Sequence, residues 1–459
     1  MRTYPARWRQ ALWILIVLSL ASWLTSCSFC PSGGYTPVKC SEFQDLPIVP
    51  LASQTSQVVS EQVGTVIVIH GSGSAKVDPG HGEIRVEQNQ AIPLYANQAT
   101  VFLNGWRANY PGDDHHVLVV STLIGKINFA FDPNTKTNRL TWDAIGVLTD
   151  TDFKEGMTWT YNFTVLAWNS ANLNAVVDQG GSQFCSPDGA YLDNYFVSAN
   201  TDTNTALSTF FSFIQNPAFA STKTVAVLPR GFGFGWSSPC EDHHIRQVAY
   251  NLDHSEIFAD HQKRYNKQNS QTPAPLPDTA SHADSGFVSW NPYAILKDND
   301  TRRDYLFAEL VSAMGGADVG VVQPPYAILP ADNGSSLFSG CGSVGSNGVV
   351  SQDFVIEDIP FQFAIPMLTG WDLEYLCDDH HVKEIGIWID HWSYQSPGLG
   401  AAGGTLQYTV KSILRDSGNS GFFSNHKITI LGLKSISGGK AGAGPAPAKA
   451  GGKALKKNS

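Results

Sequence analysis

The stretch GWRANYPGDDHHV, from Gly105 to Val117, returns twice more along the chain. Its second copy is GWSSPCEDHHI (Gly235–Ile245) and its third is GWDLEYLCDDHHV (Gly370–Val382). Each copy joins Gly-Trp to a short loop, an acidic pair, His-His and a β-branched residue. The Gly-Trp pairs lie 130 and 135 residues apart, and this regular period predicts a chain built from three copies of one structural unit.

A second repeated block follows each copy and keeps the same order. The segment LTWDAIGVLTD (140–150) matches VSWNPYAILKD (288–298) and LQYTVKSILRD (406–416) at its aromatic, aliphatic and final Asp positions. Two independent blocks in one order indicate three related modules. We place their bounds at β-module 1 (59–170), β-module 2 (171–315) and β-module 3 (316–437).

The periodicity within a module is that of β-strands. Trp159, Tyr161, Phe163 and Val165 alternate with other residues, as expected of a half-buried strand. Frequent Gly, Pro, Asn and Asp separate such runs. The sequence therefore predicts an all-β chain of three tandem related β-sandwich modules, jelly-roll or immunoglobulin-like in form. The segment 302–314 has a spacing that also fits a helix, and we interpret it as a strand because it aligns with strands in the sister modules.

The N-terminus has the pattern of an export signal. Three arginines precede an uncharged run, Ala11–Leu24, whose length of roughly 21 Å as a helix is shorter than the roughly 30 Å core of a bilayer. The tetrapeptide LTSC that ends at Cys27 resembles the lipobox of bacterial lipoproteins. This resemblance implies that residues 1–26 are a cleaved signal peptide, that Cys27 is acylated as a membrane anchor, and that Ser28 directs the lipoprotein to the outer membrane.

The sequence contains seven cysteines, an odd number. Assigning Cys27 to the lipid leaves six, and an exported chain enters a compartment where disulfides persist. Two of the six occupy the same position in modules 2 and 3, each with one upstream cysteine in its own module, while module 1 lacks both. The predicted disulfides are Cys30–Cys40, Cys185–Cys240 and Cys341–Cys377.

Three further segments have the composition of connections. We expect residues 27–58 to be a tether that follows the anchor, residues 262–284 to be an exposed loop inserted into module 2, and residues 438–459 to be a disordered basic Gly/Ala/Lys tail. The whole chain carries a net charge of −10. This balance argues against a nucleic-acid partner, which requires a basic surface.

The Asp-His-His segments offer three interpretations, which are a metal site, a structural contact and direct contact with a ligand. In a strand Asp114 and His116 share one face, so they could bind a metal ion together with the recurring Asp150. Zinc suits this ligand set better than calcium, for which histidine is a poor ligand. In the alternative, which we favour, an Asp-His pair only fastens a loop to a sheet edge, because catalytic sites rarely persist in every repeat. The equivalent residues are Asp242, His244 and Asp298 in module 2, and Asp379, His381 and Asp416 in module 3.

The sequence favours a non-catalytic binding or adhesion protein with a glycan or protein ligand. Aromatic residues that do not recur could contact such a ligand, and the candidates are Tyr265, Trp388, Trp392 and Tyr394. The recurring tryptophans are expected in the core instead: Trp106, Trp142, Trp236, Trp290 and Trp371. A structural subunit of the envelope or of a surface appendage is the alternative. A metal-dependent enzyme is the third hypothesis, and we assign no catalytic residue because no nucleophile–base set emerges.

Overall fold

The structure is a computed structural model. It describes residues 59–63, 65–79, 82–150, 155–182, 196–197, 208–209, 212–219, 224–236, 243–252, 287–290, 293–298, 305–324, 327–329, 348–376, 378–397, 403–418 and 420–434. The signal and lipobox, the tether, the inserted loop, the basic tail, Tyr265, Asp242 and all seven cysteines with their predicted disulfides lie outside these ranges. Within them the chain is all-β apart from one short 3-10 helix, Pro217–Phe219, so the predicted fold class is confirmed.

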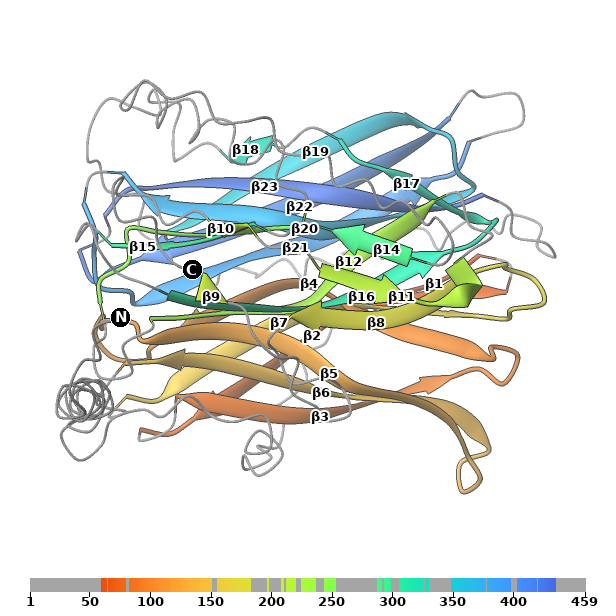
Figure 1. The fold of residues 1–459 in the computed structure, drawn as a ribbon, viewed down its shortest axis with the longest axis horizontal. Coiled ribbons are helices and arrows are strands. Elements are labelled where there is room, and N and C mark those ends of the chain that lie inside the picture. The colour runs from red at the N-terminus through yellow and green to blue at the C-terminus, as the bar shows by residue number, and fades with distance from the viewer. Residues whose placement is uncertain are drawn as a thin grey trace, which may run out of the picture.

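Most strands belong to three large antiparallel sheets (Figure 1). The first sheet contains, in spatial order, β1 (Val59–Val63), β2 (Val66–Val77), β7 (Met157–Trp168), β4 (Gln98–Asn109), β21 (Glu384–Gln395), β22 (Gly404–Arg415) and β19 (Val349–Ile359). The second contains β3 (Glu83–Ile92), β6 (Thr137–Thr149), β5 (Val119–Asp132), β12 (Val225–Trp236), β16 (Tyr305–Gly315) and β8 (Val176–Ser182), with β9 (Phe196–Val197) beside β16.

The third sheet contains β10 (Ser208–Thr209), β15 (Tyr293–Lys297), β13 (Gln247–Asn251), β20 (Phe363–Tyr375), β23 (Phe422–Leu433) and β17 (Val319–Val322), with β18 (Ala327–Leu329) beside β23. A small separate sheet pairs β11 (Ser212–Gln215) with β14 (Phe287–Trp290). The segment 302–314, interpreted from the sequence as a strand, contributes most of β16, so that interpretation is confirmed.

Every large sheet is shared between two modules. In module 1, β2, β7 and β4 belong to the first sheet, whereas β3, β6 and β5 belong to the second. The chain thus crosses repeatedly between the two layers, as in a jelly roll. Strand β5 then pairs with β12 of module 2, β13 pairs with β20 of module 3, and β21 pairs with β4 of module 1. The three modules therefore close a ring with continuous sheets across each junction, and they are not independent units in a row.

A glycine at a β-bulge in each module permits these junctions. A β-bulge precedes Gly105 in β4, Gly231 in β12 and Gly370 in β20. A Cβ atom on Gly105, whose φ is +145°, would lie 2.3 Å from the Cα of Trp388 on β21. A Cβ atom on Gly231 would lie 2.4 Å from the Cβ of Leu123 on β5. Only glycine allows the neighbouring module's strand to approach this closely.

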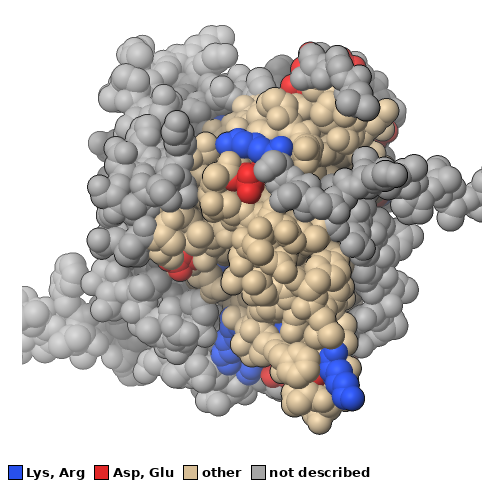
Figure 2. Space-filling view, turned by 90° about the vertical axis from the view of Figure 1, so that its right-hand side faces the viewer, with Lys and Arg blue, Asp and Glu red and all other residues tan. Residues whose placement is uncertain are grey.

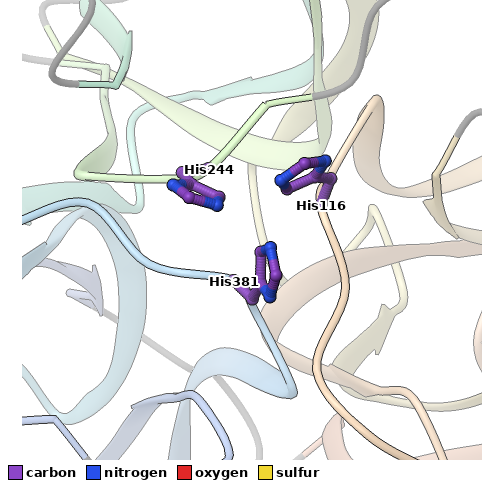
Figure 3. A group of neighbouring side chains, drawn as sticks. All are labelled: His116, His244 and His381. Carbon is purple, nitrogen blue, oxygen red and sulfur yellow. The ribbon is translucent and has the colours of Figure 1, made fainter.

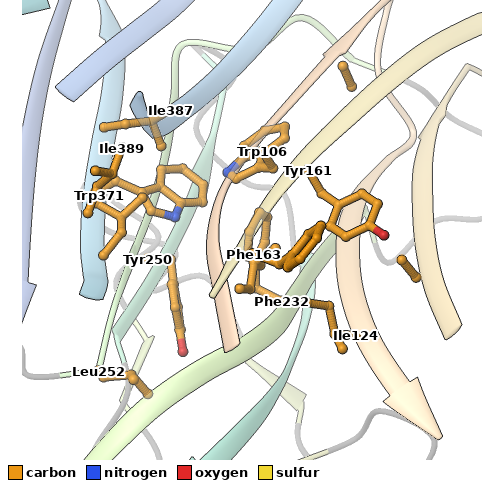
Figure 4. Close-up of a cluster of buried hydrophobic side chains, with 14 of the residues drawn as sticks. Trp106, Ile124, Tyr161, Phe163, Phe232, Tyr250, Leu252, Trp371, Ile387 and Ile389 are labelled. Atoms are coloured by element: carbon orange, nitrogen blue, oxygen red, sulfur yellow. The ribbon is translucent and has the colours of Figure 1, made fainter. Parts of the chain in front are cut away.

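The residue after each bulge glycine forms the centre of the core. The rings of Trp106, Phe232 and Trp371 lie with centroids 5.0–5.5 Å apart (Figure 4). The sequence repeat matched Trp236 with the other two tryptophans, and the structure corrects this match. The bulge glycine of module 2 lies four residues before Gly235, so Phe232 is the structural equivalent. All five recurring tryptophans are nevertheless buried, as expected: Trp106, Trp142, Trp236, Trp290 and Trp371.

A buried carboxylate joins the two halves of the first sheet. Glu384, at the start of β21, forms ion pairs with Arg107 of module 1 and, at 2.8 Å, with Arg415 of its own module. The side chain of Glu384 is only 3% exposed.

On the surface, the face in Figure 2 shows Lys, Arg, Asp and Glu scattered among uncharged residues. Within the described ranges, no helix has the length and apolar character needed to cross a membrane.

Candidate metal centre

The three Asp-His-His segments meet at one end of the ring. They connect β4 to β5, β12 to β13 and β20 to β21. Each segment therefore joins the strand that pairs with one neighbouring module to the strand that pairs with the other. Each segment exchanges backbone hydrogen bonds of 2.8–3.2 Å with both of the others. A closed backbone triangle results, because every module contacts the other two. The bridged pairs are His115–Val382, Val117–His243 and Ile245–His380.

The first histidine of each pair points back into its own module. Its Nδ1 lies 3.2–3.6 Å from a carboxylate oxygen of the recurring Asp of the second repeated block. Its ring also contacts an aromatic residue that follows Trp106, Phe232 or Trp371 by four positions in the sequence. The ring centroids of these contacts lie 4.7–5.0 Å apart. This contact holds a loop to a sheet, which is the role we favoured from the sequence. The three sets are Tyr110, His115 and Asp150; Trp236, His243 and Asp298; and Tyr375, His380 and Asp416.

The second histidine of each pair points toward a shared axis. His116, His244 and His381 come from three different modules, and their ring centroids lie 4.5–4.6 Å apart (Figure 3). One nitrogen from each ring can be chosen so that all three lie within 4.8 Å of one another. The sequence grouped ligands within each module, whereas the structure gathers one ligand from each of the three.

Carboxylates of the neighbouring modules lie near the Nδ1 atoms of two of these rings. The Nδ1 of His381 lies 3.9 Å from Asp114, and the Nδ1 of His244 lies 3.4 Å from Asp379. In both cases the carboxylate belongs to a different module from the imidazole. A carboxylate at Nδ1 favours the Nδ1–H tautomer and leaves Nε2 with a free lone pair. The Nε2 atoms of His244 and His381 are therefore the nitrogens suited to an ion on the axis.

Two groups of the site, His381 and Asp114, have shifted pKa values. Burial lowers the pKa of His381, and the neighbouring His116 and His244 lower it further. Burial alone would raise the pKa of Asp114, but hydrogen bonds from Ser417 and from its own backbone, with the charge of His381, lower it overall. A neutral imidazole is the form that binds a metal ion.

The inner side of the three histidines is apolar and the outer side is open. The residues that follow them, Val117, Ile245 and Val382, are at most 1% exposed and belong to the main core. Adjacent side chains of an extended segment point to opposite sides. The side chains of His244 and His381 are 38% and 41% exposed. An ion held by the three rings would have core beneath it and solvent above it.

The geometry fits a small transition-metal ion. Three imidazole nitrogens with a vacant fourth position are a recurring ligand set of zinc. Zinc–nitrogen bonds of about 2.0–2.1 Å place ligand nitrogens about 3.4 Å apart in a tetrahedron. The separations here reach up to 4.8 Å, so the imidazoles need to move inward by about 1 Å, which side-chain rotation can supply. Calcium and magnesium prefer oxygen ligands and fit this set poorly.

The aromatic residues proposed from the sequence as ligand contacts use their polar groups within the fold. Trp388 is 9% exposed, and its Nε1 lies 3.3 Å from Asp390. Trp392 donates from Nε1 to the Nδ1 of His70 at 3.2 Å. The hydroxyl of Tyr394 donates to a backbone carbonyl of module 3 at 2.5 Å. Trp392 and Tyr394 also pack against the core while remaining partly exposed, so a role in ligand contact stays a prediction.

Comparisons with known proteins identify no family. No family model matches the chain, and no curated protein matches it. A structure of PNGF-II is 8% identical, with 59% of this chain and 62% of that chain covered and a TM-score of 0.18. This chain therefore spans about 62% of the length of that protein.

Two virus structures cover more of the chain. The triple jelly-roll turret structure of an archaeal virus is 8% identical, covers 89% of this chain and 98% of its own, and has a TM-score of 0.13. The structure of Sulfolobus Turreted Icosahedral Virus is 8% identical, covers 89% and 100%, and has a TM-score of 0.12. TM-scores this low carry no argument about function.

Proposed function

We propose that this protein binds a transition-metal ion, with zinc as the first candidate, through His116, His244 and His381. The observation that carries the proposal is the convergence of these rings from three modules on one axis. Carboxylates at Nδ1 of two of the rings add the outer support that metal-bound histidines commonly have. Nitrogen ligands of this kind select zinc, copper or nickel over calcium and magnesium.

The ion would also stabilise the ring. Each ligand comes from a different module, so ion binding favours the state in which all three junctions are closed. A ligand that binds only the folded state stabilises it by about 2.7 kcal/mol at one hundred times its dissociation constant. Metal binding and resistance to unfolding should therefore rise together.

The cellular setting of the proposal comes from the N-terminal sequence. The lipobox at Cys27 supports an exported lipoprotein of the cell envelope, anchored to the outer membrane. We retain the interpretation of a non-catalytic binding protein and propose a metal ion as its ligand. A glycan or protein ligand at Trp388, Trp392 and Tyr394 has less support, because these residues already make contacts within the fold.

Calorimetric titration of the chelator-treated protein with Zn²⁺ tests the proposal. We expect about one ion per chain, and His116→Ala, His244→Ala and His381→Ala should each abolish saturable binding. The control is His391→Ala, because the side chain of His391 on β21 is 71% exposed and contacts no residue of the centre. Zinc binding that persists in all three variants, or none in the wild-type protein, would refute the proposal.

A further inference from the structure

The open side of the three histidines determines what else the ion could bind. This inference rests on the proposed metal site. Three protein nitrogens leave a four-coordinate zinc ion with one remaining position. Val117, Ile245 and Val382 occupy the core side of the segments, whereas the side chains of His244 and His381 are more than a third exposed. The remaining position therefore points to solvent and can be reached by a donor from another molecule.

The charge around the ion selects the kind of donor. Asp114 and Asp379 lie within 3.9 Å of the imidazoles that would carry the ion. These two carboxylates would lie beside a divalent ion and offset much of its positive charge. An anion entering this site gains little net attraction and lies close to carboxylates, which is unfavourable. A neutral donor avoids that repulsion.

We propose that the outward position of the ion accepts a neutral nitrogen donor, the imidazole of a histidine exposed on a partner protein. The ion would then bridge the end of the ring to that partner. Imidazole suits the same metals as the three internal ligands. The carboxylates reduce competition from free anions, and the position on the axis makes the ion accessible to a protruding side chain.

Cobalt spectroscopy of the full chain tests this proposal. Co²⁺ replaces zinc in nitrogen sites, and its visible spectrum changes when a ligand joins the ion. We expect N-methylimidazole to shift the spectrum saturably, at a concentration at least about tenfold lower than azide requires, a preference of about 1.4 kcal/mol. A shift by azide at an equal or lower concentration would show an anion site and overturn the proposal. A cobalt spectrum that neither ligand changes would show a closed site and also overturn it.

This experiment separates the two proposals. Failure of the metal site itself would appear earlier, as the absence of any Co²⁺ spectrum that depends on His116, His244 and His381. The variant Asp379→Asn tests the charge argument, because asparagine keeps an oxygen that accepts from Nδ1–H but removes the negative charge. The preference for N-methylimidazole over azide should shrink in this variant and stay unchanged in Asp390→Asn, an aspartate on β21. An unchanged preference in Asp379→Asn would refute the charge argument.

Discussion

A buried glutamate in module 2 gives a quantitative prediction about pH. Glu309 on β16 is fully buried, and its carboxyl oxygens accept from Trp290 Nε1 at 2.6 Å and from the Tyr250 hydroxyl at 3.1 Å. Burial raises the pKa of Glu309 from 4.5 to about 8, although the two hydrogen bonds partly oppose this shift. At neutral pH the folded protein therefore holds a protonated carboxyl where the unfolded chain has an ionised one.

The direction of the effect follows from proton linkage. Because the folded pKa of Glu309 lies above the unfolded value, its favourable contribution is complete below pH 4.5 and is lost as pH rises toward 8. Each pKa unit corresponds to about 1.4 kcal/mol, so the loss reaches about 3 kcal/mol at pH 7. The variant Glu309→Gln keeps an acceptor oxygen but cannot ionise, so it should escape this loss.

Urea unfolding at pH 5 and pH 8 measures the difference. The unfolding free energy of Glu309→Gln should rise relative to the wild type by about 3–4 kcal/mol between these pH values. Glu357→Gln serves as the control, because Glu357 on β19 is exposed. If the wild type and Glu309→Gln show parallel pH profiles, Glu309 is not held protonated and the reasoning is wrong.

Three substitutions test the ring by thermal or urea unfolding. Gly105→Ala should lower the unfolding free energy by more than about 2 kcal/mol, because its Cβ would meet Trp388 at 2.3 Å. Gly112→Ala should change the unfolding free energy little, because its Cβ would have no atom closer than 3.5 Å. Equal effects of the two substitutions would contradict the close junction. Glu384→Ala should cost about 2 kcal/mol, less than a fully buried pair because the arginines are partly exposed. A cost that high salt abolishes would show an ordinary surface pair. Phe232→Ala should cost about 3–5 kcal/mol, and a cost below 1 kcal/mol would refute its central place in the core.

The sequence predicted the strands and buried positions within a module better than it predicted how the modules pair with one another. Alternation along residues 159–165 identified strand β7, and the recurring tryptophans identified buried positions. Local periodicity does not state which strand lies beside which, so it could not show that β4 pairs with β21 of another module. The match of Trp236 to Trp106 failed for a similar reason, because the bulge glycine and not the sequence motif sets the structural register.

The sequence identified the residues of the candidate site but not their arrangement. The three Asp-His-His copies drew attention to the right residues, and the loop-fastening role expected of them belongs to the first histidine of each pair. The convergence of the second histidines depends on ring closure, which brings together His116 and His381 across 265 residues of chain. The sequence did contain an indication of this convergence, because a site on a threefold axis requires one imidazole from each of three repeats.

A crystal structure of the zinc-loaded protein, with anomalous diffraction recorded at the zinc edge, tests the central claim most directly. We predict one anomalous peak on the axis, about 2.0–2.1 Å from a nitrogen of each of His116, His244 and His381. A peak bonded instead to the first histidines and their aspartates, or no peak on the axis at saturating zinc, would contradict the account.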